Sequence, residues 1–194
     1  MPPYSIRPML PEDIELLADI RPGFITDTIL KIERLGQGLE QGWRLVETKL
    51  ATPYEKGAGY DFTPEERQNI AERLAQNNTL MEVAVEKNTG KIVGVLDVEE
   101  ELWRNTVWIW NIMLDVDARG QGIGREMIQH TISWGRRRGL RAILLETQTN
   151  NVPACKFYLR MGFQLAGINT AFYTNQDMER DEIALFWVFP LRPR

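Results

Sequence analysis

A glycine-rich stretch, DVDARGQGIG at residues 115–124, has the clearest capacity for chemistry in this sequence. A hydrophobic run precedes it and a helical pattern follows it, so its glycines stand where a strand passes into a helix. Glycine lets backbone N–H groups approach a ligand without a Cβ in the way. A helix N-terminus adds unpaired N–H groups and about half a positive charge. The stretch is therefore a candidate anion site, although glycines here also serve as simple turn residues.

Two familiar phosphate-binding loops do not match this stretch. A P-loop needs a lysine and a hydroxyl residue directly after its last glycine, and neither follows Gly124. A dinucleotide fingerprint needs GxGxxG at the start of a βαβ unit. Here the glycines stand at 120, 122 and 124, and the preceding strand belongs to an antiparallel meander. The spacing excludes both loops and leaves the anion site open.

The elements that must position this stretch follow from periodicity and turn residues. A two-residue period predicts strands at 81–86, 91–103 and 106–116. Further strands are expected at 4–7, at 141–147 as a buried strand, and at 163–174 and 181–189 as a final pair. Helical patterns cover 11–20, 63–76, 122–138 and 152–161, and the second opens with the capping box Thr63-Pro64-Glu65-Glu66. The segment from 21 to about 62 reads as irregular and glycine-rich, with one strand at 43–50. We expect one α+β domain over residues 1–194.

Composition narrows the class of protein. The chain has 194 residues, a net charge of −4, one cysteine and one histidine. Its apolar runs are too short for a membrane helix, and its N-terminus does not resemble a signal peptide. A mildly acidic domain is a poor general binder of nucleic acid. We expect a cytoplasmic protein, monomer or homodimer, with no metal, no nucleic-acid partner and no membrane partner.

The glycine stretch matches the pyrophosphate loop of one enzyme family. The run Arg119-Gly120-Gln121-Gly122-Ile123-Gly124 resembles that loop in the GNAT family of N-acetyltransferases. Asn151, Tyr158 and the pair Gly162-Phe163 stand where the family has an asparagine, a tyrosine and a Gly-Phe pair. The resemblance implies a mixed, mostly antiparallel sheet, split between the strands at 106–116 and 141–147 and flanked by helices. It also implies acetyl-CoA as cosubstrate, bound by a core at 80–194, with 1–79 on the substrate side.

Within this family, three segments look like the streptothricin acetyltransferases. They are LLETQTNNVPACKFYLRMGFQLAG (144–167), DEIALFW (181–187) and TPYEKGAGYDF (52–62). The resemblance implies acetylation of a primary amine on a small cationic substrate, foremost the β-lysine amine of streptothricin. A polyamine, an amino sugar or a protein N-terminus is an alternative acceptor. A non-catalytic acetyl-CoA sensor is an alternative from another class.

The resemblance assigns cofactor contacts residue by residue. Asn151 corresponds to an asparagine that contacts the cofactor arm, but an asparagine there also suits a helix N-cap. The other expected cofactor-binding residues are Leu114, Asp115 and Val116 at the strand end, and Arg119, Gly120, Gln121, Gly122, Ile123, Gly124 and Arg125 in the loop.

Two residues are expected to move protons. Tyr158 corresponds to a family tyrosine that protonates the departing CoA thiolate, and Glu146 lies where some members place a general base. The alternatives are an aromatic side chain packed on the sheet for Tyr158 and a structural carboxylate for Glu146.

Candidate substrate contacts come from an acidic strand and a matched segment. Strand alternation puts Asp97 and Glu99 on one face, near Trp110, whose indole ring attracts ammonium groups. Solvated charges and core packing are the alternative readings. Tyr54 and Glu55 are added because they lie in the matched segment at 52–62.

Overall fold

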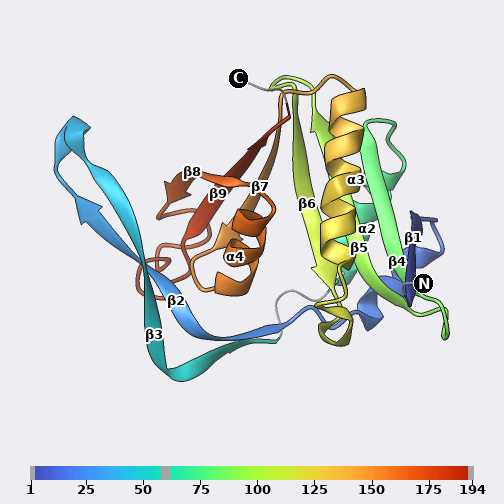
Figure 1. The fold of residues 1–194 in the computed structure, drawn as a ribbon, viewed down its shortest axis with the longest axis horizontal. Coiled ribbons are helices and arrows are strands. Elements are labelled where there is room, and N and C mark those ends of the chain that lie inside the picture. The colour runs from blue at the N-terminus through green and yellow to red at the C-terminus, as the bar shows by residue number, and fades with distance from the viewer. Residues whose placement is uncertain (1–2, 58–61, 192–194) are drawn as a thin grey trace. The chain divides into compact units, whose positions relative to one another are not determined.

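The computed structural model describes residues 3–57 and 62–191, and Figure 1 shows its helices and strands. The chain divides into two compact units. The first unit comprises Met1–Gly23, Lys56–Leu145 and Val188–Arg194, and the second comprises Phe24–Glu55 and Glu146–Trp187. The single domain expected over residues 1–194 stays a prediction.

The first unit is built on an antiparallel meander. Strands β1 (Tyr4–Pro8), β4 (Thr79–Glu86), β5 (Ile92–Glu101) and β6 (Thr106–Leu114) pair in that order. Gly90 and Asn105 adopt positive φ in the two turns, where such backbone is least costly for glycine and asparagine. The predicted meander is therefore confirmed.

A parallel pairing interrupts this antiparallel pattern. β6 pairs with β7 (Ala142–Gln148) at Val107–Ile143 and Trp108–Leu144, near the start of both strands. The seven strands follow the order β1-β4-β5-β6-β7-β9-β8, with β8 at Gln164–Asn169 and β9 at Ala184–Pro190. The sheet is thus mixed and mostly antiparallel in its first unit, and the predicted α+β class is confirmed.

Helices cover the first unit. α2 (Pro64–Leu74) begins as the capping box predicts, and α3 (Ile123–Arg137) follows the glycine stretch. The helix expected at 11–20 is shorter, because α1 (Asp13–Leu16) tightens into a 3₁₀ turn, Leu17–Asp19. The core packs apolar side chains of these elements together: Met9, Ile14, Leu17, Ile20, Phe62, Ile70, Met81, Val83, Ile92 and Val95.

The second unit corrects one prediction. Residues 24–56 are not irregular, because β2 (Phe24–Leu35) and β3 (Gly42–Lys56) form a two-stranded sheet (Figure 1). The glycines that suggested irregularity make its turn, where Gly36 and Gly38 adopt φ of +68° and +58°. β-branched residues on both strands supply the strand preference. Residues 58–61 of the matched segment at 52–62 lie outside the described residues.

An aromatic cluster forms the core of the second unit. α4 (Val152–Arg160) contributes Tyr158, whose ring centroid lies 5.4 Å from that of Phe163 and 6.5 Å from that of Trp187. The Trp187 indole N–H donates to Thr147 Oγ1 at 2.8 Å, so the buried ring also has its polar atom satisfied. Each such ring contributes roughly 1.5–3 kcal/mol by burial. Among the described helices, none is both long and apolar enough to cross a membrane.

Replacing Thr63 tests the start of α2. Thr63 Oγ1 accepts a hydrogen bond from the Glu66 amide at 3.2 Å, and this bond is lost in Thr63→Ala. We expect the free energy of unfolding to fall by about 1 kcal/mol, measured by urea denaturation. Thr63→Ser keeps the hydroxyl and should retain most of the stability. Equal stability of the two variants would show that the cap contributes nothing.

Candidate functional site

The glycine-rich loop at residues 119–122 leads into helix α3, and no side chain caps the N-terminus of this helix. Gly120 and Gly122 adopt φ of +76° and +88°, and Gly122 is the N-cap of α3. No side chain caps this helix, so its first N–H groups keep their capacity for an acceptor. Arg119 to Gly122 and Arg125 are exposed, whereas Ile123 and Gly124 are buried and anchor the first turn. The loop therefore has the exposure and polarity that an anion site requires.

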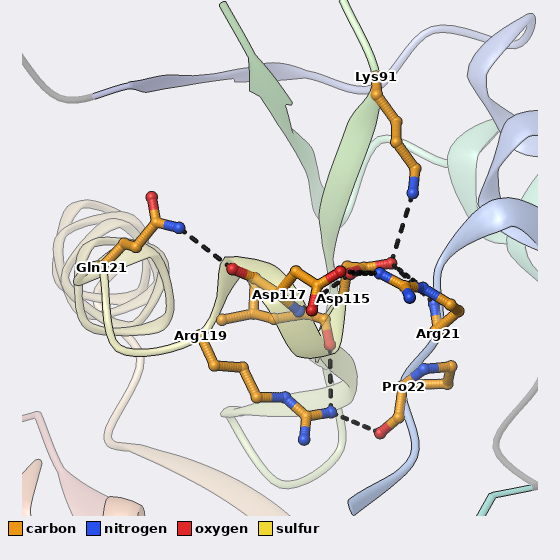
Figure 2. Close-up of polar contacts among 8 residues, drawn as sticks. Arg21, Pro22, Lys91, Asp115, Asp117, Arg119 and Gln121 are labelled. Carbon is orange, nitrogen blue, oxygen red and sulfur yellow. Dashed lines mark hydrogen bonds and ion pairs between the residues drawn. The ribbon is translucent and has the colours of Figure 1, made fainter. Parts of the chain in front are cut away.

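A buried carboxylate fixes the chain just before this loop (Figure 2). Asp115 accepts hydrogen bonds from Arg21, at 2.6 Å from Nη2 and 3.1 Å from Nε, and one from the Asp117 amide at 3.1 Å. Lys91 lies 3.5 Å away. Burial opposes ionisation, but the bonds from Arg21 and the Asp117 amide outweigh it and hold the pKa of Asp115 well below its usual range. Asp115 thus joins the end of β6 to the segment that follows α1.

Arg119 makes a second set of contacts before the loop. Figure 2 shows its guanidinium beside two backbone carbonyl oxygens. It donates to Pro22 O at 2.6 Å and to Leu114 O at 3.2 Å. The amides of Asp115 and Val116 donate to Val93 O and Arg21 O. The amides of Asp115 and Val116 and the carbonyl of Leu114 are therefore already hydrogen-bonded within the first unit. A cofactor that contacts residues 114–116 would have to use their other backbone groups. Gln121 donates to Asp117 O at 3.3 Å.

The acidic face of β5 contains a buried ion pair. Asp97 is fully buried, and Arg73 of α2 donates to its carboxylate at 2.6 Å. Asn111 donates to the same carboxylate at 3.2 Å and to Glu66 at 2.9 Å. Burial raises the pKa of Asp97, and the bonds from Arg73 and Asn111 oppose that rise. Asp97 therefore has no surface of its own for a substrate, and its predicted substrate contact stays a prediction.

A bulge in β6 brings Trp110 to the neighbouring acid. Asp97 pairs with Asn111 and Val98 with Ile109, so Trp110 is the extra residue. Trp110 is 50% exposed, and its indole N–H donates to Glu99 at 2.9 Å. No described residue gives Glu99 a cationic partner. The Arg73 guanidinium lies over the Trp110 ring, 5.2 Å from its centroid, so this ring already meets a cation of the protein. The predicted substrate contacts of Trp110 and Glu99 stay predictions.

In the second unit, the candidate base has a partner that the sequence did not indicate. The Tyr173 hydroxyl donates to Glu146 on β7, and Gln148 donates to the same hydroxyl oxygen at 3.0 Å. Tyr173 lies in the segment between β8 and β9, and no local pattern relates it to β7. It orients the Glu146 carboxylate, whose role as a base stays a prediction.

Asp177 holds the segment that carries Tyr173. Its carboxylate accepts from the amides of Phe172, Tyr173 and Thr174 at 2.8, 2.9 and 2.6 Å. Burial opposes ionisation, but these bonds and the Thr174 hydroxyl keep the pKa of Asp177 below its usual value. The segment between β8 and β9 is therefore fixed by one carboxylate.

α4 presents the predicted asparagine and tyrosine. Asn151 caps the helix, because its Oδ1 accepts from the Ala154 amide at 3.2 Å. Tyr158 is 7% exposed and packs in the aromatic cluster. Asn151 is thus a helix N-cap and Tyr158 a packed aromatic side chain, as the alternative interpretations of the sequence expected. A functional role is compatible with both positions. Burial raises the pKa of Cys155 to about 11, so its thiol stays protonated at neutral pH.

The remaining predicted residues lie on β3. Tyr54 accepts a hydrogen bond from Asn150 Nδ2 at 3.4 Å, and its ring centroid lies 6.1 Å from that of Phe24. Glu55 is exposed. The structure therefore brings Tyr54, but not Glu55, into contact with the residues that precede α4. Within 3–57 and 62–191, no group of His, Cys, Asp and Glu side chains is arranged to hold a metal ion.

Comparisons with known proteins decide the family. The model of the acetyltransferase (GNAT) family matches residues 43–163, well over half of the chain. The chain belongs to the GNAT acetyltransferase family. It is 28% identical to a streptothricin acetyltransferase of Streptomyces lavendulae, covering 96% of this chain and 95% of that protein. The expected GNAT fold is confirmed, and the chain is an acetyl-CoA-dependent N-acetyltransferase of this type.

Two solved structures extend the similarity over the whole length. A nourseothricin acetyltransferase superposes with a TM-score of 0.80 at 27% identity, covering 98% of this chain and 99% of the other. A streptothricin acetyltransferase described for Bacillus anthracis, in complex with acetyl coenzyme A, superposes with a TM-score of 0.76 at 25% identity. This alignment covers 96% of the present chain and 97% of the Bacillus anthracis protein.

Replacing Asp115 tests the clamp before the loop. Asp115→Asn removes the charge that Arg21 faces, and we expect the free energy of unfolding to fall by roughly 1–3 kcal/mol near neutral pH. The lowered pKa means that Asp115 stabilises the fold above an unfolded pKa of about 3.9, and that this contribution is lost as pH falls below it. The free energy of unfolding, measured by urea denaturation, should therefore fall less steeply between about pH 5 and pH 2 in the variant than in wild type. Parallel curves for variant and wild type would contradict the ion pair.

Proposed function

We propose that this chain acetylates a primary amine of a small polycationic compound, foremost the β-lysine amine of streptothricin. The observation that carries the proposal is similarity over almost the entire chain to proteins that are named for this antibiotic class. The net charge of −4 favours a cationic acceptor. The expected monomer or homodimer and the cytoplasmic location remain predictions.

The loop of the first unit is proposed to bind the cofactor's pyrophosphate. Its exposed glycines and the uncapped start of a 15-residue helix fit a doubly negative group. In this proposal Arg119 and Asp115 act by holding the loop, since their side chains are engaged within the first unit. Acetyl-CoA supplies the activated acetyl group as a thioester.

The second unit is proposed to supply the proton transfers. The neutral amine nitrogen attacks the thioester carbonyl, so a C–N bond forms and the C–S bond breaks. Glu146, oriented by Tyr173, accepts the proton that the nitrogen loses, directly or through water. Tyr158 donates its proton to the departing sulfur. The burial of Tyr158 among aromatic rings excludes water from this donor.

A panel of acceptors tests the substrate. Streptothricin, spermidine and model peptides are offered with acetyl-CoA, and product masses are measured. We expect a gain of one acetyl group on streptothricin. Acetylation of only another amine would replace the proposed acceptor, and tight acetyl-CoA binding without any transfer would favour a sensor.

Tyr158→Phe tests the proposed acid. The variant keeps the aromatic ring and its packing but lacks the phenolic hydroxyl and its proton. We therefore expect kcat to fall about 100-fold or more. The Kd for acetyl-CoA, measured by calorimetry, should not change, and thermal unfolding checks the fold. Unchanged turnover would remove Tyr158 from the mechanism.

Glu146→Gln tests the proposed base. The amide keeps an acceptor for Tyr173 but cannot take up a proton, so kcat should fall about 100-fold or more. The matched control is Glu179→Gln, an exposed carboxylate in the same unit, which should behave as wild type. A pH–rate profile that is the same in Glu146→Gln and wild type would assign the base elsewhere.

A further inference from the structure

The Tyr173 hydroxyl lies in a chain of hydrogen bonds that has one direction. Gln148 Nε2 donates to the Tyr173 oxygen at 3.0 Å, and the Tyr173 hydroxyl donates to Glu146 Oε1. Residues 146 and 148 share one face of β7, because side chains alternate along a strand. The phenol has a single proton, and in this arrangement that proton points to Glu146. The chain therefore runs from an amide donor, through the phenol, to the carboxylate.

Contacts that do not involve Glu146 hold the phenol in place. Asp177 accepts a hydrogen bond from the Tyr173 amide at 2.9 Å, which fixes the backbone at this residue. The Tyr173 ring centroid lies 5.1 Å from that of Phe172, which in turn lies 5.4 Å from that of Phe186 on β9. Both contacts remain when the hydroxyl alone is removed. The role of the hydroxyl can therefore be tested apart from the role of the ring.

Two elements of the second unit pack against β7, and their ionisable groups have other surroundings. The neighbouring strand β9 has no ionisable side chain. On α4, Cys155 faces the other side of β7; burial raises the pKa of its thiol to about 11, and the Glu146 charge adds to that rise. Lys156 of the same helix lies 2.6 Å from Glu47. The chain that ends on Glu146 is thus made by β7 and the segment between β8 and β9.

This chain favours the ionised form of the Glu146 carboxyl. A hydrogen bond donated to a carboxylate stabilises the charged form over the protonated one. Such a charge-assisted bond is roughly twice as strong as a bond between neutral groups. The bond that Tyr173 accepts from Gln148 polarises its hydroxyl and strengthens the bond that it donates. An ionised carboxylate is also the form that a general base requires.

We propose that Tyr173, polarised by Gln148, is a positioning residue that keeps the Glu146 carboxylate in its ionised, proton-accepting form. The inference rests on the proposed function in one respect, namely that Glu146 is the general base. It assigns the acidic limit of the enzyme's working pH range to a hydroxyl group 27 positions away from that base in the chain.

The pH dependence of Tyr173→Phe tests the proposal, with kcat measured for streptothricin and acetyl-CoA. Loss of the hydroxyl favours protonated Glu146, so the acidic limb should move about 0.5–1 pH unit higher. On that limb kcat should fall about three- to tenfold, and on the plateau it should stay within about twofold of wild type. The control Phe172→Leu removes a ring contact but keeps the hydroxyl, so its limb should not move. An equal loss of kcat at every pH in Tyr173→Phe would show a merely structural role and overturn the proposal.

A titration of the enzyme without substrate separates this inference from the proposed function. Side-chain carboxyl signals of ¹³C-labelled glutamate are followed against pH, and the Glu146 signal is the one absent from Glu146→Gln. We expect its midpoint to rise by about 0.5–1 pH unit in Tyr173→Phe and by less in Gln148→Leu. Equal midpoints in wild type and Tyr173→Phe would overturn the proposal and leave the proposed base standing. A raised midpoint, with a pH–rate profile that Glu146→Gln does not change, would support the hydrogen-bond chain and contradict Glu146 as the base.

Discussion

The ion pair between Asp115 and Arg21 is the interaction on which the backbone geometry before the glycine loop depends. It joins residues 94 positions apart in the chain and closes the end of β6 against the segment after α1. The same carboxylate accepts the Asp117 amide, so it also shapes the turn that leads to the glycines. Arg119 reinforces this junction from the other side by donating to Pro22 O and Leu114 O. The geometry of the glycine loop thus depends on side chains that are themselves engaged in contacts with the segment before β2.

A corresponding junction exists in the second unit at Thr149. Its amide donates to Ile183 O, its carbonyl accepts from the Leu30 amide, and its hydroxyl bonds to Asp181 O and the Ile183 amide. One residue thus ties β2, the end of β7 and the start of β9 together. Asn150 is buried, and its Oδ1 has no hydrogen-bond partner among the described residues. Asn150 and Asn151 follow directly, so this partly unsatisfied amide and the helix cap are held by a fixed backbone. The rigidity of this point explains how a polar side chain such as Asn150 can stay buried at a cost.

The sequence predicted those parts whose signals are local. The meander, α3 and the cap of α2 follow from period, glycine position and the Thr63–Glu66 box. The helical pattern at 152–161 places Asn151 at the N-cap of α4 and Tyr158 within the helix. The long hairpin was missed because glycines that form one turn resemble those of an irregular segment. The contacts of Arg73 with Asp97 and of Tyr173 with Glu146 join distant residues and leave no periodic trace. Such pairs depend on the folded chain, so only the structure identifies them.

Asp177 has a consequence for the thermodynamics of recognition. By binding three successive amides, its carboxylate removes the backbone freedom of residues 172–174 when the protein folds. A ligand that meets Tyr173 therefore encounters a side chain on an ordered backbone, and little conformational entropy remains to be lost at that moment. Affinity at this position should then reflect the complementarity of the contact itself. Flexible loops, in contrast, lose part of each contact's free energy to their own ordering.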